Sequence, residues 1–105
     1  MFSIKKAFED LNGLQFKQKF EQTPDAVLLD VRTQSEYLSG NIPGAANIDI
    51  MSYEFHDKIA ALDKNKIYFI YCRSGNRSAQ ACNIMSEMGF KTYNLAGGIG
   101  AWPFN

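Results

Sequence analysis

Two short and mainly apolar runs stand out in the hydrophobic pattern of the chain. Residues 27–31 read VLLDV after the turn sequence TPD, and residues 67–71 read IYFIY after DKNK. Apolar character that does not alternate with polar residues predicts strands that are covered on both faces, as in the middle of a parallel sheet. The shorter runs at 46–48 and 91–93 predict further strands.

Three segments that alternate with these strands show the spacing of an amphipathic helix. Their alternation with strands predicts βαβ units, and therefore an α/β sheet with helices on both faces. Ligands of such sheets bind at the carboxyl ends of the strands. The helical spacing is carried by Phe16 and Phe20 after the capping residue Asn12, by Phe55, Ile59 and Leu62 after Ser52, and by Ala81, Ile84, Met85 and Met88 before Gly89.

Composition narrows the class of protein. The 105 residues are 46% apolar and 13% aromatic, which suits a single globular domain spanning residues 1–105 with a core of its own. Eleven Lys and Arg balance eleven Asp and Glu, so the formal net charge is zero. A general nucleic-acid or anionic-membrane binder normally carries a basic excess, so we expect neither partner.

The chain shows no feature that predicts secretion, a membrane span or a metal. Residues 1–10 lack the continuous apolar stretch of a signal peptide, and Met1 favours a whole chain over an excised domain. No apolar run approaches membrane thickness. Two cysteines make no disulfide framework and are not spaced as zinc ligands. We therefore expect a cytoplasmic protein without a metal or cofactor.

The segment 72–78, CRSGNRS, follows the second apolar strand and precedes a predicted helix. A strand-to-helix turn gathers backbone N–H groups beside the positive end of the helix dipole, and Gly75 allows a tight curl there. Arg73 and Arg77 add two positive charges. These features favour a lowered thiol pKa and a nucleophilic thiolate at Cys72, rather than a cysteine that merely ends a buried strand.

This loop resembles the active-site loop of the rhodanese family of sulfurtransferases. Residues 30–45 resemble the upstream signature of that family, with Asn41 where a histidine is common, and residues 95–102, LAGGIGAW, resemble its C-terminal signature. The three segments follow the order of the family and cover the chain from the first apolar strand onward.

The resemblance implies a five-stranded parallel sheet with helices on both faces and a persulfide on Cys72. The thiolate would take the outer sulfur of a donor such as thiosulfate and pass it to a thiol or cyanide, with ping-pong kinetics. Backbone amides of the loop would cradle the transferred sulfur, and the arginines would attract the anionic donor. The implied substrate-binding residues are Arg73, Ser74, Gly75, Asn76, Arg77 and Ser78.

Three alternatives to a thiosulfate sulfurtransferase exist on this fold. Phosphatases and arsenate reductases carry Cys-x5-Arg, whereas Arg77 makes the spacing Cys-x4-Arg here, which suits a single sulfur atom better than a tetrahedral oxyanion. Rhodanese-like binding modules without activity often lack the cysteine, which this chain keeps. A protein persulfide carrier, with a protein donor or acceptor, stays open.

Several residues outside the loop are expected to have structural rather than catalytic roles. We expect the lone histidine, His56, to be a solvated helix residue rather than a catalytic base. Cys82 lies about 15 Å of helical rise after Cys72, too far for a disulfide, and is expected to pack in the core. Arg32 and Glu36, one turn apart, are expected to join Asp30 in tying a strand end to the next helix. Trp102 is expected to pack the C-terminal turn onto the core, with a place at the mouth of the pocket as the alternative.

Overall fold

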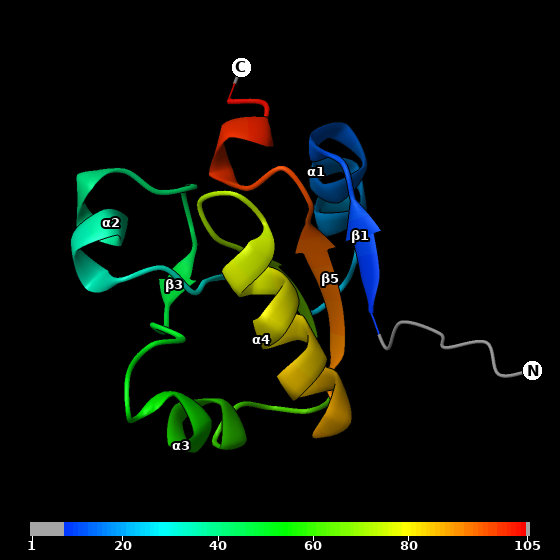
Figure 1. Ribbon diagram of the computed structural model, residues 1–105. Coiled ribbons are helices and arrows are strands. Elements are labelled where there is room, and N and C mark those ends of the chain that lie inside the picture. Colours follow the sequence, from blue (N-terminus) through cyan, green and yellow to red (C-terminus); the bar gives the residue numbers. More distant parts are fainter. Residues whose placement is uncertain (1–7, 105) are drawn as a thin grey trace, which may run out of the picture.

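The computed structural model describes residues 8–104, so most of the segment examined for a signal peptide, residues 1–7, lies outside the described residues. Strands and helices alternate along the chain (Figure 1). The strands are β1 (Glu9–Leu11), β2 (Ala26–Asp30), β3 (Ala46–Asn47), β4 (Ile67–Tyr71) and β5 (Lys91–Leu95). The helices are α1 (Gly13–Gln22), α2 (Gln34–Ser39), α3 (Phe55–Ala60) and α4 (Asn76–Glu87), followed by the 3₁₀ turn η1 (Ile99–Ala101).

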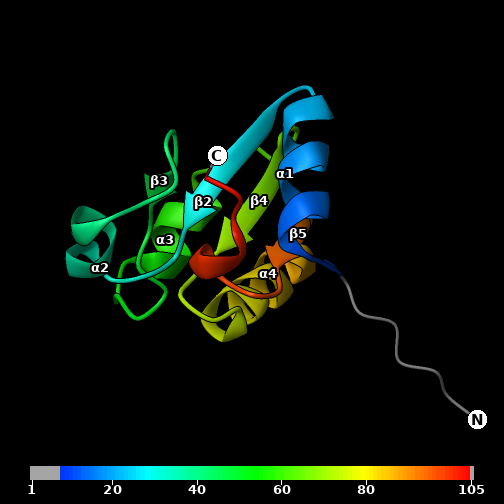
Figure 2. The ribbon, with the colours of Figure 1, turned by 90° about the horizontal axis from the view of Figure 1, so that it is seen from above.

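All five strands pair in parallel in the order β1-β5-β4-β2-β3, which confirms the expected five-stranded parallel sheet. The two mainly apolar runs form the neighbouring strands β2 and β4, with Leu29 opposite Ile70. Seen from above, these two strands run side by side (Figure 2). The strand β4 is central, so its carboxyl end opens onto the middle of one sheet edge.

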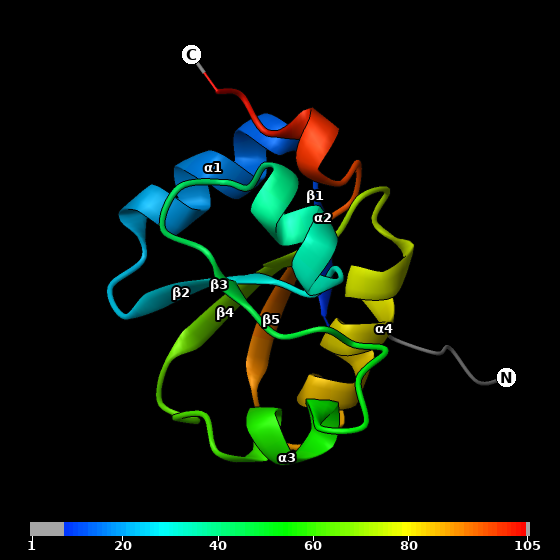
Figure 3. The same cartoon turned by 90° about the vertical axis from the view of Figure 1, so that its left-hand side faces the viewer.

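Each face of the sheet carries its own apolar core. On one face, Ile70 packs with Ile59 of α3 and Met85 of α4. On the other face, Phe69 packs with Phe16 of α1, and their rings meet edge to face at 5.4 Å. Figure 3 shows α1 and α4 on opposite sides of the sheet, which is the predicted arrangement with helices on both faces.

The observed bounds of two elements differ from those that the sequence predicts. The predicted helix after Ser52 begins only at Phe55, because Ser52 forms a turn in which its Oγ accepts from the N–H of Glu54 at 3.1 Å. The strand expected at 91–93 extends to Leu95. The hydrophobic pattern indicates neither β1, which exists through its pairing with the distant strand β5, nor α2, which buries no residue.

Within residues 8–104, no helix combines the length and the apolar character that a membrane crossing needs.

Candidate active site

Cys72 directly follows β4, at the carboxyl end of the central strand, and the segment 73–75 carries the chain into α4. The cysteine is completely buried. Its carbonyl accepts from the N–H of Ile99 at 2.9 Å, which joins the loop to the C-terminal turn. A reagent can therefore reach the sulfur only after a local displacement of its neighbours.

Two hydrogen-bond donors converge on the sulfur of Cys72. The backbone N–H of Gly75 lies 3.1 Å from Sγ, and the hydroxyl of Ser78 lies 3.2 Å from it. Gly75 is the N-cap of α4 and Ser78 lies in its first turn, so the positive end of the helix dipole faces the same atom. The loop thus surrounds a sulfur atom with donors and supplies positive potential.

This environment lowers the pKa of the Cys72 thiol below its ordinary value. Burial acts in the opposite direction and is the largest single effect, because it disfavours the charged thiolate. The Ser78 hydroxyl and the backbone amides of Ser78, Gly75 and Ser74 together outweigh it. The arrangement therefore stabilises a buried thiolate, which is the nucleophilic form of cysteine.

Removal of the Ser78 hydroxyl is expected to raise the thiol pKa. A hydrogen bond to a charged group is worth about 1.5–3 kcal/mol, so Ser78→Ala should slow alkylation of Cys72 about tenfold or more at pH values below the wild-type midpoint. The measurement is the rate of iodoacetamide modification against pH. Ser74→Ala is the matched control, because the Ser74 side chain is exposed and only its backbone amide acts on the sulfur. Equal rates in the two variants would contradict this role of Ser78.

The loop is packed from outside by the C-terminal glycine segment. Gly75 has φ +102°, and a Cβ on it would overlap the carbonyl oxygen of Ala96. Gly98 has φ +72°, and a Cβ there would overlap the carbonyl of Arg73. The two backbone segments can approach each other this closely only because each carries a glycine at the point of contact. The C-terminal segment therefore packs directly against the Cys72 loop.

Arg77 does not project as a free charge. Its guanidinium makes a bidentate ion pair with Glu36 of α2, with Nη1–Oε1 at 2.7 Å and Nη2–Oε2 at 2.9 Å. The sequence predicts Arg77 to be one of two charges available to an anionic donor. The long-range pairing instead makes it a link between α2 and the first turn of α4, next to Ser78. Arg73 is exposed, and within residues 8–104 the structure gives it no ion pair.

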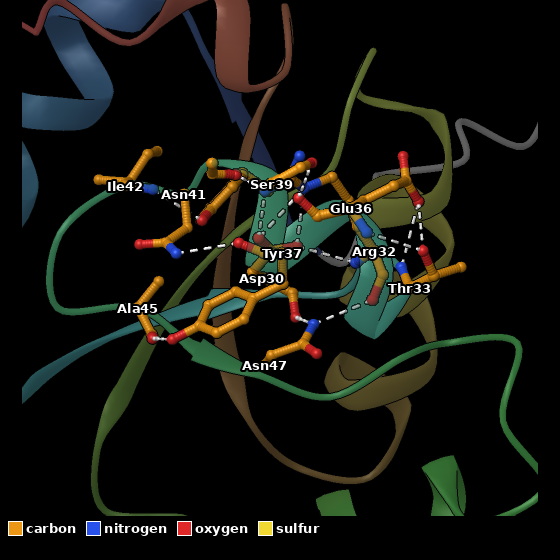
Figure 4. Close-up of polar contacts among 12 residues, drawn as sticks. Asp30, Arg32, Thr33, Glu36, Tyr37, Ser39, Asn41, Ile42, Ala45 and Asn47 are labelled. Carbon is orange, nitrogen blue, oxygen red and sulfur yellow. Dashed lines mark hydrogen bonds and ion pairs between the residues drawn. The ribbon is translucent and has the colours of Figure 1, made fainter.

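The expected tie between Arg32 and Glu36 is wrong. Arg32 turns back to Asp30, its Nη2 lying 2.7 Å from Oδ2, and the same Nη2 donates to the Gly40 carbonyl at 2.6 Å. Asn47 closes this corner by donating to the carbonyls of Asp30 and Arg32 (Figure 4). Thr33 caps α2, so Arg32 lies outside the helix and helical spacing does not apply to it.

Glu36 serves both its own helix and the Cys72 loop. Its Oε1 accepts from the backbone N–H of Thr33 at 3.1 Å while the Thr33 hydroxyl accepts from the N–H of Glu36, which is a capping box (Figure 4). The same carboxylate binds Arg77. The sequence pattern Thr33-x-x-Glu36 could have predicted α2, but no local signal predicts the pairing with Arg77.

The pair with Arg77 holds the pKa of Glu36 down to about 2, against 4.5 for an ordinary glutamate. A lowered carboxyl pKa contributes stability above pH 4.5 that is lost as the pH falls toward about 2. Glu36→Gln is therefore expected to lower the free energy of unfolding by about 1 kcal/mol at pH 7. The difference from the wild type should shrink as the pH falls from 4.5 toward 2.

Urea unfolding at a series of pH values measures this difference. Glu87→Gln, which removes an exposed carboxylate from the far end of α4, provides the matched control and should change little at any pH. A pH-independent effect of Glu36→Gln would show that the charge of the Glu36 carboxylate is not what stabilises the fold.

Three residues outside the loop lie as the sequence predicted. His56 is exposed on α3, and Trp102 packs its ring at 6.2 Å from Phe16 of the core. Cys82 is completely buried in the same apolar cluster as Met85, and burial raises its pKa to about 12. Both cysteines are free thiols, so Cys82 is a packed core residue and stays protonated at neutral pH.

A polar cavity of about 300 Å³ lies beside α2 and α3 and does not include the loop. Its lining is Gln34, Asn47, Asp49, Ser52, Glu54 and Lys58. The hydrogen bonds to Cys72 make the loop the better candidate for chemistry.

Comparisons with known proteins agree with this geometry. The sequence profile of the Rhodanese-like domain family matches residues 14–103. The candidate sulfurtransferase YtwF of Bacillus subtilis is 38% identical over 94 residues, covering 90% of this chain and 89% of its own. The thiosulfate sulfurtransferase PspE of Escherichia coli is 37% identical over 71 residues, covering 68% of each chain. The crystal structure of a rhodanese-like domain protein from Staphylococcus aureus superposes with a TM-score of 0.79 at 30% identity, covering 91% of this chain and 92% of that one.

Proposed function

Because this chain belongs to the rhodanese-like sulfurtransferase family, we propose that it transfers sulfane sulfur through a persulfide on Cys72. The convergence of the Gly75 amide and the Ser78 hydroxyl on Sγ carries the proposal. These donors favour the thiolate that attacks, and they are aimed at the place where negative charge returns when the sulfur leaves. Both cysteines are free thiols, the state that a reducing cytoplasm maintains.

The reaction comprises two displacements at sulfur. In the first, the Cys72 thiolate attacks the outer sulfur of thiosulfate, a new Sγ–S bond forms, and the S–S bond of the donor breaks to release sulfite with the electron pair. In the second, an acceptor thiolate or cyanide attacks the outer sulfur of the persulfide. The Sγ–S bond breaks, and its electron pair regenerates the Cys72 thiolate. Neither step needs a cofactor or an external oxidant.

Arg73 is the charge we assign to capture of an anionic donor, because Glu36 already neutralises Arg77. Arg73→Ala is expected to lower kcat/KM for thiosulfate about three- to tenfold at low ionic strength, and less at high salt, where exposed charges are screened. Lys58→Ala removes the same charge from α3, which lies at the opposite end of the molecule from the loop (Figure 1), and should have little effect. A loss that is independent of salt would assign Arg73 a geometric role instead.

Initial-rate kinetics with thiosulfate and cyanide tests the proposed function. A persulfide that forms before the acceptor binds gives parallel lines in double-reciprocal plots, whereas direct transfer in a ternary complex gives intersecting lines. The same assay with a protein persulfide as donor distinguishes a thiosulfate enzyme from a persulfide carrier. PspE is named for thiosulfate, so we expect turnover with that donor.

A further inference from the structure

Asn94 lies behind the Cys72 loop, on the central part of the sheet. It pairs with Ile70 across β4 and β5 and is 2% exposed. Its Nδ2 donates to the carbonyl oxygen of Gly75 at 3.3 Å and to Oδ1 of Asp10 at 2.9 Å. One amide group therefore connects the loop that holds Cys72 to the edge strand β1.

The hydrogen bond from the backbone to the sulfur of Cys72 depends on the orientation of Gly75. Its N–H donates to Sγ of Cys72, while its carbonyl accepts from the N–H of Ala79 at 3.2 Å and from Asn94. A glycine at φ +102° has no Cβ that restricts its rotation, so its conformation depends on such external contacts. Asn94 is the side chain that anchors the carbonyl side of this residue.

The side-chain amide of Asn94 lowers the stability of the fold in a way that packing does not explain. Its Oδ1 is buried and has no hydrogen-bond partner among residues 8–104, and the two acceptors that Nδ2 binds fix which way the amide points. A buried acceptor without a partner destabilises a fold, and a leucine of similar size would avoid that cost. A polar group that costs stability beside a reactive loop is typical of a functional position.

We propose that Asn94 is a positioning residue for the reaction at Cys72, which holds Gly75 so that its N–H points at the sulfur. The inference rests on the proposed function of Cys72. The contacts run from Asp10 through Asn94 to Gly75 and then to Sγ, so β1 supports the loop through one side chain. Asn94 does not touch the sulfur itself, and its effect passes through the Gly75 peptide.

Asn94→Leu is the decisive variant, because it keeps the size of the side chain and removes both donors. The readout is the rate of Cys72 alkylation by iodoacetamide against pH, since the midpoint of that profile reports ionisation separately from access. Cys82, with a pKa of about 12, stays unreactive over this range. Arg77 and Cys82 of α4 interact electrostatically with Cys72, and the variant changes neither side chain. Asp10, which loses its hydrogen bond from Asn94 in the variant, acts electrostatically on Cys82.

We expect the midpoint to rise by about one pH unit, with alkylation at pH values below the wild-type midpoint slowed about tenfold and sulfur transfer slowed with it. Thr92→Val is the matched control. Thr92 lies two residues earlier on β5 and is equally buried, and its hydroxyl pairs with Ser86 of α4 at 2.9 Å without touching the loop. It should lower the temperature of unfolding and leave the midpoint where it is.

An unchanged midpoint and unchanged turnover in folded Asn94→Leu would overturn the positioning role. If that variant does not fold, Asn94→Ala removes the same donors and is judged by the same two readouts. A wild-type protein that transfers no sulfur, while Asn94→Leu still shifts the alkylation midpoint, would contradict the proposed function and leave the positioning of Cys72 standing.

Discussion

Replacement of Cys72 by serine is expected to abolish sulfur transfer while the fold persists. Loss of an attacking nucleophile costs about 10⁴-fold or more in turnover, because the hydroxyl of serine is a far weaker nucleophile than the thiolate. The serine oxygen is buried, yet the Gly75 amide and the Ser78 hydroxyl remain to bond it, so stability should change by only about 1 kcal/mol. Turnover with thiosulfate and cyanide and thermal unfolding measure the two effects.

Cys82→Ala is the control for this experiment. Cys82 is as deeply buried as Cys72, but burial raises its pKa to about 12 and it contributes no thiolate. This variant should keep most of its sulfur transfer. Substantial turnover in Cys72→Ser, or a complete loss in Cys82→Ala, would assign the chemistry to a different thiol.

Gly75→Ala is expected to have the second largest effect. The new Cβ would overlap the carbonyl of Ala96, and alanine does not readily adopt φ +102°. Both problems are relieved only by moving the loop, which takes the Gly75 amide away from Sγ. We expect a loss of about 2–4 kcal/mol in the free energy of unfolding and about a hundredfold loss of turnover.

Gly100→Ala makes the same chemical change where it should be harmless. Apart from its chain neighbours, no atom of residues 8–104 lies within 4 Å of a Cβ on Gly100, and the backbone of Gly100 is outside the left-handed region. The expected change in stability is within about 0.5 kcal/mol, with normal turnover. Comparable activity in Gly75→Ala and Gly100→Ala would show that the sulfur does not depend on the conformation of this loop.

The central part of the fold could be predicted from the sequence because its signals are local. The strands β2 and β4 are runs of apolar residues, and α4 has a regular stripe that Gly89 ends. The strand β1 has no such signal, since Glu9 and Asp10 are exposed and the strand exists through its pairing with β5. The helix α2 buries no residue, so periodicity could not indicate it.

The same distinction holds for the candidate site. The chemical character of the 72–78 loop is local, because one strand end, one glycine and one helix start lie within it. The ion pair of Arg77 has no local signal in the sequence, because its partner Glu36 is 41 residues away. The two side chains meet only when α2 and α4 have taken their places in the fold. Asn94 was missed for the same reason, because its link to Gly75 depends on the register of β5 against β4.

The most direct test of a persulfide on Cys72 is the intact mass of the protein before and after incubation with thiosulfate. The proposal predicts a gain of one sulfur atom that a reducing thiol or cyanide reverses, present in wild-type protein and in Cys82→Ala and absent in Cys72→Ser. An unchanged wild-type mass under conditions where sulfur is transferred, or the same gain in Cys72→Ser, would contradict it.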